Sequence, residues 1–338
     1  MRIALVQKSE NNAVWWYRLL PWQYLSRQSG GAIQIQVVRP DNLTAFESVI
    51  AAYDVIIFHC PHSKRDFEAM CTAKDYNVKV VIDYDDLIFD VPNVNRASAF
   101  YNREGTQEAI INCYKIADAV TVSTDALADE IEKMFGKRPT VINNAHNDLC
   151  LPGLSKFNQP QNGVNTILWR GSETHIGDLM RYRDAFEQYE NIDWNFWGGV
   201  PDLAISSKYG GRMESWTHKG WEPGIPNYFR NLKNLKPNFV LVPLELGRFN
   251  DCKSNIAYLE ATYAGAVCIA TEVKEFDRPG VVTFENTSEL TNILEQVNSG
   301  EIDWQTYHMY AVMDLEKNYR LSKVNQLRAD LLQKLYAA

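Results

Sequence analysis

Cysteine is sparse in this chain, and no two cysteines are spaced as C-x-x-C. The six cysteines are scattered, at positions 60, 71, 113, 150, 252 and 268. This spacing argues against a zinc site, a dithiol redox motif and a disulfide-rich scaffold. It is typical of a reducing compartment, so we expect a cytoplasmic protein.

Long apolar runs are missing too, since none reaches the roughly 18 residues of a membrane span. The segment 1–6 is too short and too soon followed by polar residues for a signal peptide. No G-x-G-x-x-G motif follows the first apolar stretch, which disfavours a dinucleotide-dependent dehydrogenase. Basic residues do not predominate either: 34 of them against 42 acidic ones give a net charge of −8. Bulk charge therefore argues against nucleic-acid binding, although it is compatible with a local basic groove.

What the chain does contain suits an ordinary globular protein of about two domains, with 338 residues of which 46% are hydrophobic. Aromatic residues make up 12% and include nine tryptophans. Packing in a core or interface explains them best, and stacking surfaces for sugars or bases are the alternative. Trp15 and Trp16, after the first expected strand, are interpreted as packing residues, while Arg18 beside them can face a site.

The first part of the chain alternates short apolar strands with amphipathic helices. We expect strands at 3–6, 33–38, 54–59, 78–83, 119–123 and 141–142. A helix capped by Ser123 or Thr124 is expected after the fifth strand. This alternation predicts a doubly wound parallel sheet.

A segment poor in periodicity, 143–165, is interpreted as a linker, after which the alternation restarts. The second series of expected strands is 166–169, 194–197, 239–242 and 267–270, with helices at 176–189, 227–235, 254–264 and 288–297, a looped stretch at 199–226 and a helical tail from 303. Leu327, Leu331 and Leu335 of that tail are predicted to be core residues. The predicted architecture is α/β, with two parallel-sheet domains facing a cleft and ligands at the carboxyl ends of the strands.

One stretch carries more chemistry than the others. Lys253 lies at the expected start of a helix, Glu260 follows seven residues later, and Gly265 ends the helix. A helix N-terminus with a lysine suits an anion, and a carboxylate on the same helix face can bind a ribose diol. A solvated helix surface is the alternative for Glu260.

This stretch resembles the nucleotide-sugar motif of GT-B glycosyltransferases, of the retaining family 4 type. Glu260 matches the ribose-binding glutamate of that family, and the run 264–271 matches the segment that follows it. At Cys252 the family often has another glutamate, and at Ala257 a basic residue. The resemblance implies a GT-B fold, with an acceptor domain at 1–150, a nucleotide-sugar donor domain at 151–310, and a helix at 311–338 that packs back on the first domain.

Three further segments agree with the resemblance: 117–124, 141–147 and 168–175. They resemble, in order, an acceptor-domain strand, the interdomain connection, and the strand and glycine loop that open the donor domain. By resemblance, the donor-binding residues are Arg170, Gly171, Ser172, His175, Lys253, Ser254, Asn255 and Glu260. Arg170 and Lys253 would neutralise the leaving diphosphate, so no metal and no cofactor is expected beyond the nucleoside-diphosphate sugar itself, and activity should survive chelation.

Polar groups follow two strands of the first domain. The cluster 83–86 carries three aspartates, of which Asp85 and Asp86 are candidates for acceptor binding or base catalysis. A metal–diphosphate clamp and a turn-capping role are the alternatives. His59 ends the preceding strand, and similar enzymes have a sugar-contacting histidine there. The run from His59 to His62 also allows a zinc interpretation, but no second ligand pair lies nearby in sequence.

The resulting prediction is a glycosyltransferase that moves a sugar from a nucleoside-diphosphate sugar to an acceptor hydroxyl with retention, using His59, Asp85 and Asp86 as catalytic residues. Its acceptor would be a glycan, a small molecule or a DNA base. The last case would be an enzyme of bacteriophage type acting on hydroxymethylated bases through a local groove built from Lys64, Arg65, Lys208, Arg212, Lys219, Arg230, Trp216 and Trp221. A non-catalytic sugar-nucleotide or glycan-binding protein of the same fold is the other alternative, motivated by Cys252.

Overall fold

The chain forms two units, each built around its own sheet. The computed structural model describes residues 1–39, 49–186, 189, 191–198, 216–219 and 224–337. Unit 1 comprises Met1–Ala145, Cys252–Ser254 and Leu321–Ala338, and unit 2 comprises His146–Asp251 and Asn255–Arg320. The chain therefore leaves unit 1 after Ala145, re-enters it for Cys252–Ser254, and returns to it a second time for its last helix.

Unit 1 contains a six-stranded parallel sheet in the order β2-β1-β3-β4-β5-β6. The strands are β1 (Arg2–Val6), β2 (Gln34–Val38), β3 (Val55–His59), β4 (Lys79–Tyr84), β5 (Ala119–Val122) and β6 (Thr140–Val141). The central strands are almost wholly buried because helices cover both faces of a parallel sheet. The predicted alternation of strands and helices is confirmed. The chain order reverses between β1 and β3, which is the position where doubly wound sheets bind ligands.

The helices of unit 1 are η1 (Trp15–Leu19), α1 (Leu20–Gln28), η3 (Ile50–Ala52), α3 (Lys64–Asp75), α4 (Ser98–Tyr101), α5 (Glu104–Ile116), α6 (Asp125–Phe135) and α15 (Leu321–Ala337). Two of them, α3 and α6, begin at a side-chain cap. Ser63 and Asp66 form a capping box at α3, and the predicted cap of α6 is Thr124. These caps start both helices just after the carboxyl ends of β3 and β5.

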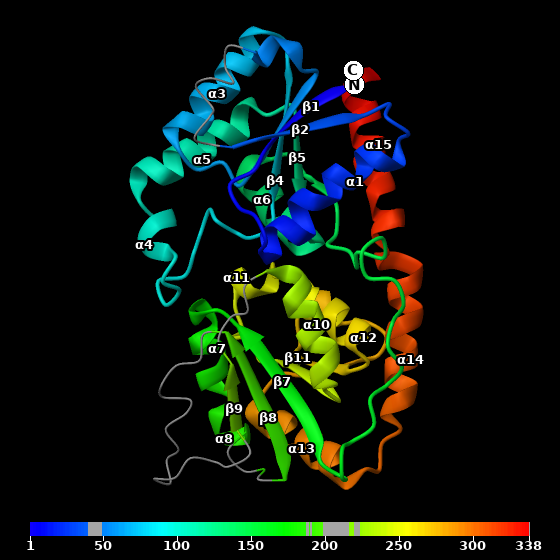
Figure 1. Ribbon diagram of the computed structural model, residues 1–338. Helices are drawn as coiled ribbons and strands as arrows, with labels where there is room; N and C mark the ends of the chain where they lie inside the picture. The colour runs from blue at the N-terminus through cyan, green and yellow to red at the C-terminus, as the bar shows by residue number, and fades with distance from the viewer. Residues whose placement is uncertain (40–48, 187–188, 190, 199–215, 220–223, 338) are drawn as a thin grey trace. The chain divides into compact units, whose positions relative to one another are not determined.

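The last helix packs within unit 1. Figure 1 shows α15, in red, beside α1, in blue, with the two chain ends close together. Leu331 and Leu335 join Trp22 in the core cluster of this unit, as predicted. The prediction for Leu327 was wrong, because its side chain is 42% exposed on the outer face of α15. Trp16 is buried, which agrees with its interpretation as a packing residue.

Unit 2 contains a second six-stranded parallel sheet, in the order β12-β11-β10-β7-β8-β9. Its strands are β7 (Asn165–Gly171), β8 (Ile192–Gly198), β9 (Trp216–Lys219), β10 (Phe239–Val242), β11 (Val267–Thr271) and β12 (Val281–Phe284). Strands β9 and β12 were not predicted from the sequence, and β9 falls in the stretch that was expected to be looped. Both lie at the edges of the sheet. The chain order reverses between β7 and β10.

The helices of unit 2 differ from the prediction at two places. They are η4 (Glu173–His175), α7 (Ile176–Arg181), α8 (Arg183–Phe186), α10 (Ile225–Leu235), α11 (Arg248–Asp251), α12 (Ile256–Ala264), η5 (Lys274–Phe276), α13 (Thr287–Ser299), α14 (Trp304–Asp314) and η6 (Leu315–Tyr319). The predicted helix at 176–189 is interrupted at Tyr182. Helix α12 begins at Ile256, so Lys253 precedes the helix and does not share a face with Glu260 as predicted. Among the described residues, no helix is long and apolar enough to cross a bilayer.

Candidate functional site

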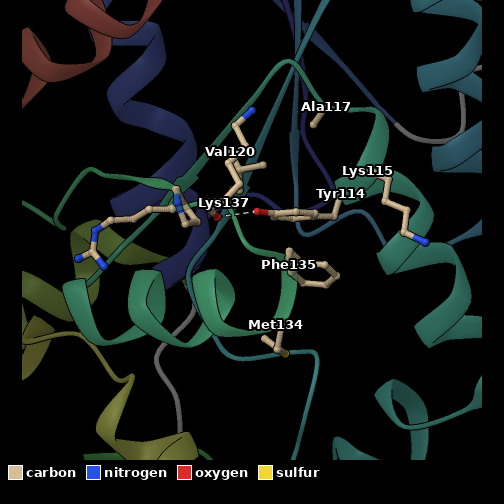
Figure 2. Close-up of a pocket in the computed structure, with 9 residues that line it drawn as sticks. Tyr114, Lys115, Ala117, Val120, Met134, Phe135 and Lys137 are labelled. Atoms are coloured by element: carbon tan, nitrogen blue, oxygen red, sulfur yellow. Dashed lines mark hydrogen bonds between the residues drawn. The ribbon is translucent and has the colours of Figure 1, made fainter.

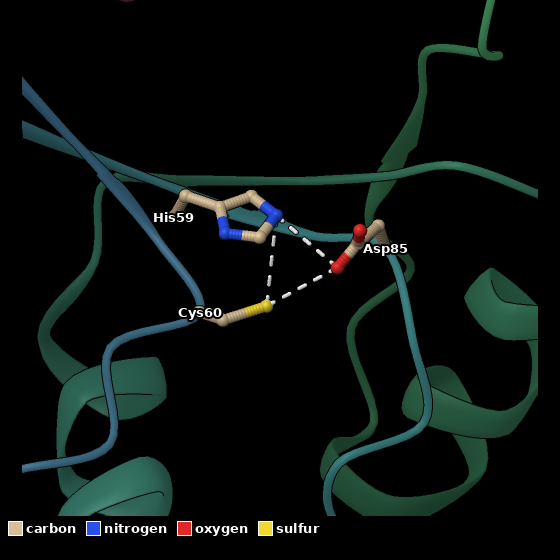
Figure 3. A group of neighbouring side chains, drawn as sticks. All are labelled: His59, Cys60 and Asp85. Carbon is tan, nitrogen blue, oxygen red and sulfur yellow. Dashed lines mark hydrogen bonds and ion pairs between the residues drawn. The ribbon is translucent and has the colours of Figure 1, made fainter. Parts of the chain in front are cut away.

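Three side chains converge at the carboxyl ends of β3 and β4 in unit 1 (Figure 3). His59 is the last residue of β3, Cys60 follows it, and Asp85 follows β4. The distance from His59 Nε2 to Asp85 Oδ1 is 3.1 Å, and Cys60 Sγ lies 3.4 Å from the same oxygen and 3.8 Å from His59 Nε2. Two of the three predicted catalytic residues, His59 and Asp85, are therefore in direct contact.

The charges of this cluster depend on one another. Burial alone would lower the pKa of His59, but the Cys60 sulfur and the Asp85 carboxylate outweigh burial and raise that pKa well above its ordinary value. Burial would raise the pKa of Asp85, but the charge and hydrogen bond of His59 lower it. Burial also raises the pKa of the Cys60 thiol. The protonation states of the three groups are therefore coupled.

Asp83 has a different role from its neighbour Asp85. It is buried, and Arg18 Nε donates a 2.8 Å hydrogen bond to its Oδ2 while Arg18 Nη2 bonds the other oxygen. Arg18 also donates to the Ile142 carbonyl and to Asn144 Oδ1. Because this bidentate pair occupies Asp83, a metal–diphosphate clamp that requires Asp83 is not supported. Arg18 was assigned no partner from the sequence.

Asp86 is paired with Lys253, although the sequence analysis assigned these two residues to opposite substrates. Lys253 Nζ lies 2.8 Å from Asp86 Oδ1. The next residue, Ser254, accepts a 2.9 Å hydrogen bond from Asn144 Nδ2. Lys253 and Ser254 thus belong to unit 1, whereas the other predicted donor-binding residues belong to unit 2.

In unit 2, a buried ion pair lies beside the point where the chain order reverses. Arg170, near the carboxyl end of β7, lies 2.6 Å from Glu260 Oε2 through its Nε. Tyr228 of α10 donates a 2.6 Å hydrogen bond to the same oxygen. Burial, followed by the charge of Glu260, raises the pKa of Tyr228 well above its ordinary value, so its hydroxyl remains a donor. Two predicted donor-binding residues, Arg170 and Glu260, are thus brought together.

The environment of Glu260 excludes a solvated helix surface, which was the alternative for this residue. Its side chain is only 6% exposed, and the rest of α12 from Ala257 to Ala264 is buried as well. Asn255 occupies the N-cap position and is itself buried, yet no described N–H of the first turn donates to its side chain. The side chain of Asn255 therefore does not cap the first turn of α12.

The loop after β7 is shaped by close packing and by a residue that the sequence analysis missed. A Cβ atom at Gly171 would lie 2.6 Å from the Trp169 ring, so only glycine fits. His175 Nδ1 lies 2.7 Å from Asp178 Oδ2. Asp178 is buried, and its other oxygen accepts hydrogen bonds from the Glu245 backbone N–H and from Asn250 Nδ2. Asp178 therefore orients His175, and its spacing three residues after that histidine on one helical turn is the signal that could have identified it.

Only part of the predicted basic groove lies among the residues that the structure describes. Lys64 is exposed and lies 3.7 Å from Glu68, one turn along α3. Arg230 donates a hydrogen bond to Asn227 on its own helix. Lys208, Arg212 and Trp221 lie outside the described residues, as do the side chains of Trp216 and Lys219.

A pocket of about 430 Å³ lies elsewhere on unit 1, near the start of β5 and β6 (Figure 2). Tyr114 and Phe135 stack in it with ring centroids 4.1 Å apart, and Tyr114 Oη donates to the Lys137 carbonyl. The pocket is lined by Tyr114, Lys115, Ala117, Val120, Met134, Phe135, Lys137, Arg138 and Pro139. None of the predicted site residues lines it, and it borders the amino ends of its strands, away from the carboxyl edge.

No known family profile and no curated protein matches the chain. Solved structures do match it over its whole length. HepE of Anabaena in complex with UDP-glucose is 13% identical, with a TM-score of 0.67 over 99% of this chain and 100% of that one. A UDP-forming trehalose-phosphate synthase from Burkholderia xenovorans is 11% identical, with a TM-score of 0.65 over 100% and 99%. A variant of T4 phage BGT in complex with UDP-glucose is 13% identical, with a TM-score of 0.55 over 99% of both chains. The similarity establishes the GT-B fold.

Proposed function

We propose that the chain is a glycosyltransferase that transfers a sugar from a nucleoside-diphosphate sugar to an acceptor hydroxyl. The fold supports this proposal, because HepE and T4 phage BGT share it and were solved with UDP-glucose. Fold alone does not determine function, so the residues of the site must also suit this reaction. The observation that carries it is the buried group of Arg170, Glu260 and Tyr228 beside the reversal of strand order in unit 2.

In the proposed donor complex, Glu260 binds the ribose hydroxyls and Arg170 neutralises the diphosphate. The Glu260 carboxylate, held by a hydrogen bond from Tyr228 and an ion pair with Arg170, can accept charge-assisted bonds from a diol without moving. Arg170 then exchanges the carboxylate of Glu260 for the more strongly charged diphosphate, which gains from a fixed cation in a poorly solvated site. The glycine loop at Gly171 and the first turn of α12 supply backbone N–H groups to the phosphate oxygens.

The proposed acceptor end is the carboxyl edge of unit 1. His59 and Asp85 are candidates to contact the acceptor hydroxyl and the transferred sugar. Lys253, which pairs with Asp86, is the candidate to neutralise the leaving phosphate. Retention at the anomeric carbon is the outcome that the resemblance to glycosyltransferase family 4 implies. Neutralisation by arginine, lysine and a helix N-terminus implies that the donor binds without a metal, so chelation with EDTA should leave the Kd of UDP-glucose unchanged.

Donor binding tests the proposal through Glu260→Gln. UDP-glucose is titrated into the parent and the variant by calorimetry, because the similar structures contain it. Each charge-assisted hydrogen bond lost costs about 1.5–3 kcal/mol, so we expect the Kd to rise about 10- to 150-fold. Glu272→Gln, an exposed glutamate just after β11, is the matched control and should bind like the parent.

Two outcomes would count against the proposal in different ways. If UDP-, GDP-, ADP- and TDP-sugars all fail to bind the parent, the donor site itself is wrong. If a sugar nucleotide binds at a Kd that Glu260→Gln raises, yet neither hydrolysis nor transfer to any acceptor occurs, the chain is a binding protein of this fold and not an enzyme.

A further inference from the structure

We propose that His59, Cys60 and Asp85 form a Zn²⁺ site at the carboxyl edge of unit 1. This inference concerns metal binding by unit 1 alone, so it holds or fails independently of the donor site in unit 2. It also revises the expectation that the chain uses no metal.

The three ligand atoms already have nearly the separations that a tetrahedral zinc ion needs. Zinc bonds of roughly 2.0–2.3 Å to nitrogen, oxygen and sulfur put neighbouring ligand atoms about 3.3–3.6 Å apart. The observed separations are 3.1 Å between nitrogen and oxygen, 3.4 Å between sulfur and oxygen, and 3.8 Å between nitrogen and sulfur (Figure 3). Shifts of a few tenths of an ångström therefore place all three within bonding distance of one ion.

The fold brings together ligands that lie far apart in the sequence. His59 is the register partner of Asp83 in the parallel pair β3–β4, so residue 85 extends just beyond the end of β3. The Cys60 N–H donates to the Asp83 carbonyl at 2.9 Å, which fixes the backbone where it leaves the strand. Cys60 has φ = 43°, a left-handed conformation that is unfavourable for a non-glycine residue. Such strain is typical of functional positions, and here it accompanies a thiol that faces His59 and Asp85.

The second histidine of the run 59–62 is not part of this site. His62 Nδ1 lies 2.7 Å from the Cys60 carbonyl and 3.4 Å from Lys8 Nζ. The sequence showed no further zinc ligand close to the run 59–62 along the chain. The structure supplies Asp85 from the neighbouring strand end instead.

Charge and burial also suit a divalent ion. A thiolate and a carboxylate balance the two charges of Zn²⁺, so the loaded site is neutral, as a buried site requires. Zinc is bound by a thiolate and a neutral imidazole, so its affinity for this site should rise with pH. His59 and Cys60 are each 7% exposed, while the Asp85 side chain is 21% exposed. The site is therefore accessible from the Asp85 side.

Three protein ligands leave one tetrahedral position for water or a substrate hydroxyl, as in catalytic rather than structural zinc sites. A hydroxyl bound there becomes more acidic because the ion stabilises its conjugate base. If the proposed glycosyltransferase function holds, this position would bind and activate the acceptor hydroxyl. That consequence rests on the proposed function, whereas metal binding does not.

Metal titration of the purified full chain tests the site. After treatment with chelator and its removal, Co²⁺ is added as a spectroscopic probe for Zn²⁺, and binding is followed by the thiolate-to-cobalt charge-transfer absorption. We expect one ion per chain and displacement of Co²⁺ by Zn²⁺. Cys60→Ser should abolish the charge-transfer band, and Asp85→Asn should weaken Zn²⁺ binding by more than the roughly 10- to 100-fold that loss of an outer-shell partner costs. Cys71→Ser, a half-buried cysteine of the same unit, should match the parent.

A second measurement uses the parent chain only, in case a variant does not fold. Zn²⁺ should slow alkylation of Cys60 relative to Cys113, another buried cysteine of unit 1, when both are followed by mass spectrometry. The proposal is overturned if the parent binds no Co²⁺, if the band persists in folded Cys60→Ser, or if Zn²⁺ leaves the alkylation of Cys60 unchanged. UDP-glucose binding is measured on the same samples, so failure of the donor site is recorded separately.

Discussion

Buried carboxylates in unit 1 each have their own cationic partner. Asp66 is paired with Lys8, Asp83 with Arg18, and Asp85 with His59. Such pairs contribute little net stability relative to apolar residues, but removal of one partner leaves the other buried and uncompensated. They therefore act mainly by fixing which side chains face each other at the carboxyl edge of the sheet.

Asp66→Asn should destabilise unit 1. Asp66 Oδ2 accepts hydrogen bonds from Lys8 Nζ at 2.7 Å, from the His62 N–H at 3.0 Å and from the Ser63 N–H at 3.1 Å. The amide that replaces the carboxylate loses its charge. Because the Lys8 side chain is 23% exposed and partly solvated, we expect a loss of about 2–3 kcal/mol in the free energy of unfolding.

Urea unfolding followed by circular dichroism measures this change. Asp75→Asn, at the exposed far end of α3, is the control and should alter stability by no more than about 0.5 kcal/mol. Equal midpoints for Asp66→Asn and the parent would show that the capping contacts of α3 add nothing.

At the scale of elements, two helices of unit 2 end in the same way but in different surroundings. Both α12 and α13 end at a left-handed glycine, Gly265 with φ = 86° and Gly300 with φ = 70°. A Cβ atom on Gly265 would lie 2.2 Å from the Lys156 carbonyl oxygen, whereas one on Gly300 would meet nothing within 4 Å. The close approach at Gly265 fixes the position of α12, and with it that of Glu260.

Gly265→Ala should therefore cost much more stability than Gly300→Ala. Left-handed backbone costs alanine about 1 kcal/mol or slightly more at either site. The clash with Lys156 forces a backbone shift at Gly265 that adds about 1–3 kcal/mol. Differential scanning calorimetry of both variants measures the comparison, and a similar Tm for the two would contradict it. UDP-glucose binding should weaken only in Gly265→Ala, because only α12 carries a donor-site residue.

At the scale of the whole molecule, the two units should respond differently to acid. Burial would raise the pKa of Asp66 and of Asp83, but Lys8 and Arg18, respectively, lower them below their ordinary values. A carboxyl whose pKa is lower in the folded state stabilises that state above about pH 4 and loses this contribution as the pH falls further. In unit 2, the hydrogen bond from the Thr306 side chain lowers the pKa of Asp303, which lies at the surface.

Unit 1 should consequently open first as the pH falls from about 5 to 3. Hydrogen exchange followed by mass spectrometry, corrected for the intrinsic pH dependence of exchange, compares peptides from β1–β4 with peptides from β7–β11. We expect the free energy of opening to fall more in unit 1. Asp66→Asn should reduce the slope of that fall, because it removes one of the titrating groups. Earlier opening of unit 2 would contradict the assignment.

The sequence by itself determined the alternation of strands and helices, the two parallel sheets and most central strands. These features follow from local periodicity, because a strand buried on both faces must be apolar throughout. It also placed candidate residues at carboxyl ends of strands: His59 ends β3, Asp85 follows β4, and Arg170 lies one residue before the end of β7. It failed at the edge strands β9 and β12, and at the start of α12, where it placed Lys253 at the helix start.

Only the tertiary structure decided which of these side chains have which partners. Asp83 and Asp85 are two residues apart, yet one binds Arg18 and the other faces His59 and Cys60. Glu260 was predicted to bind a ribose diol, with a solvated helix surface as the alternative, but its contacts with Arg170 and Tyr228, which come from two other elements, were not predicted. Such contacts depend on strand register and helix packing across long separations in the chain, and local sequence patterns carry no record of either.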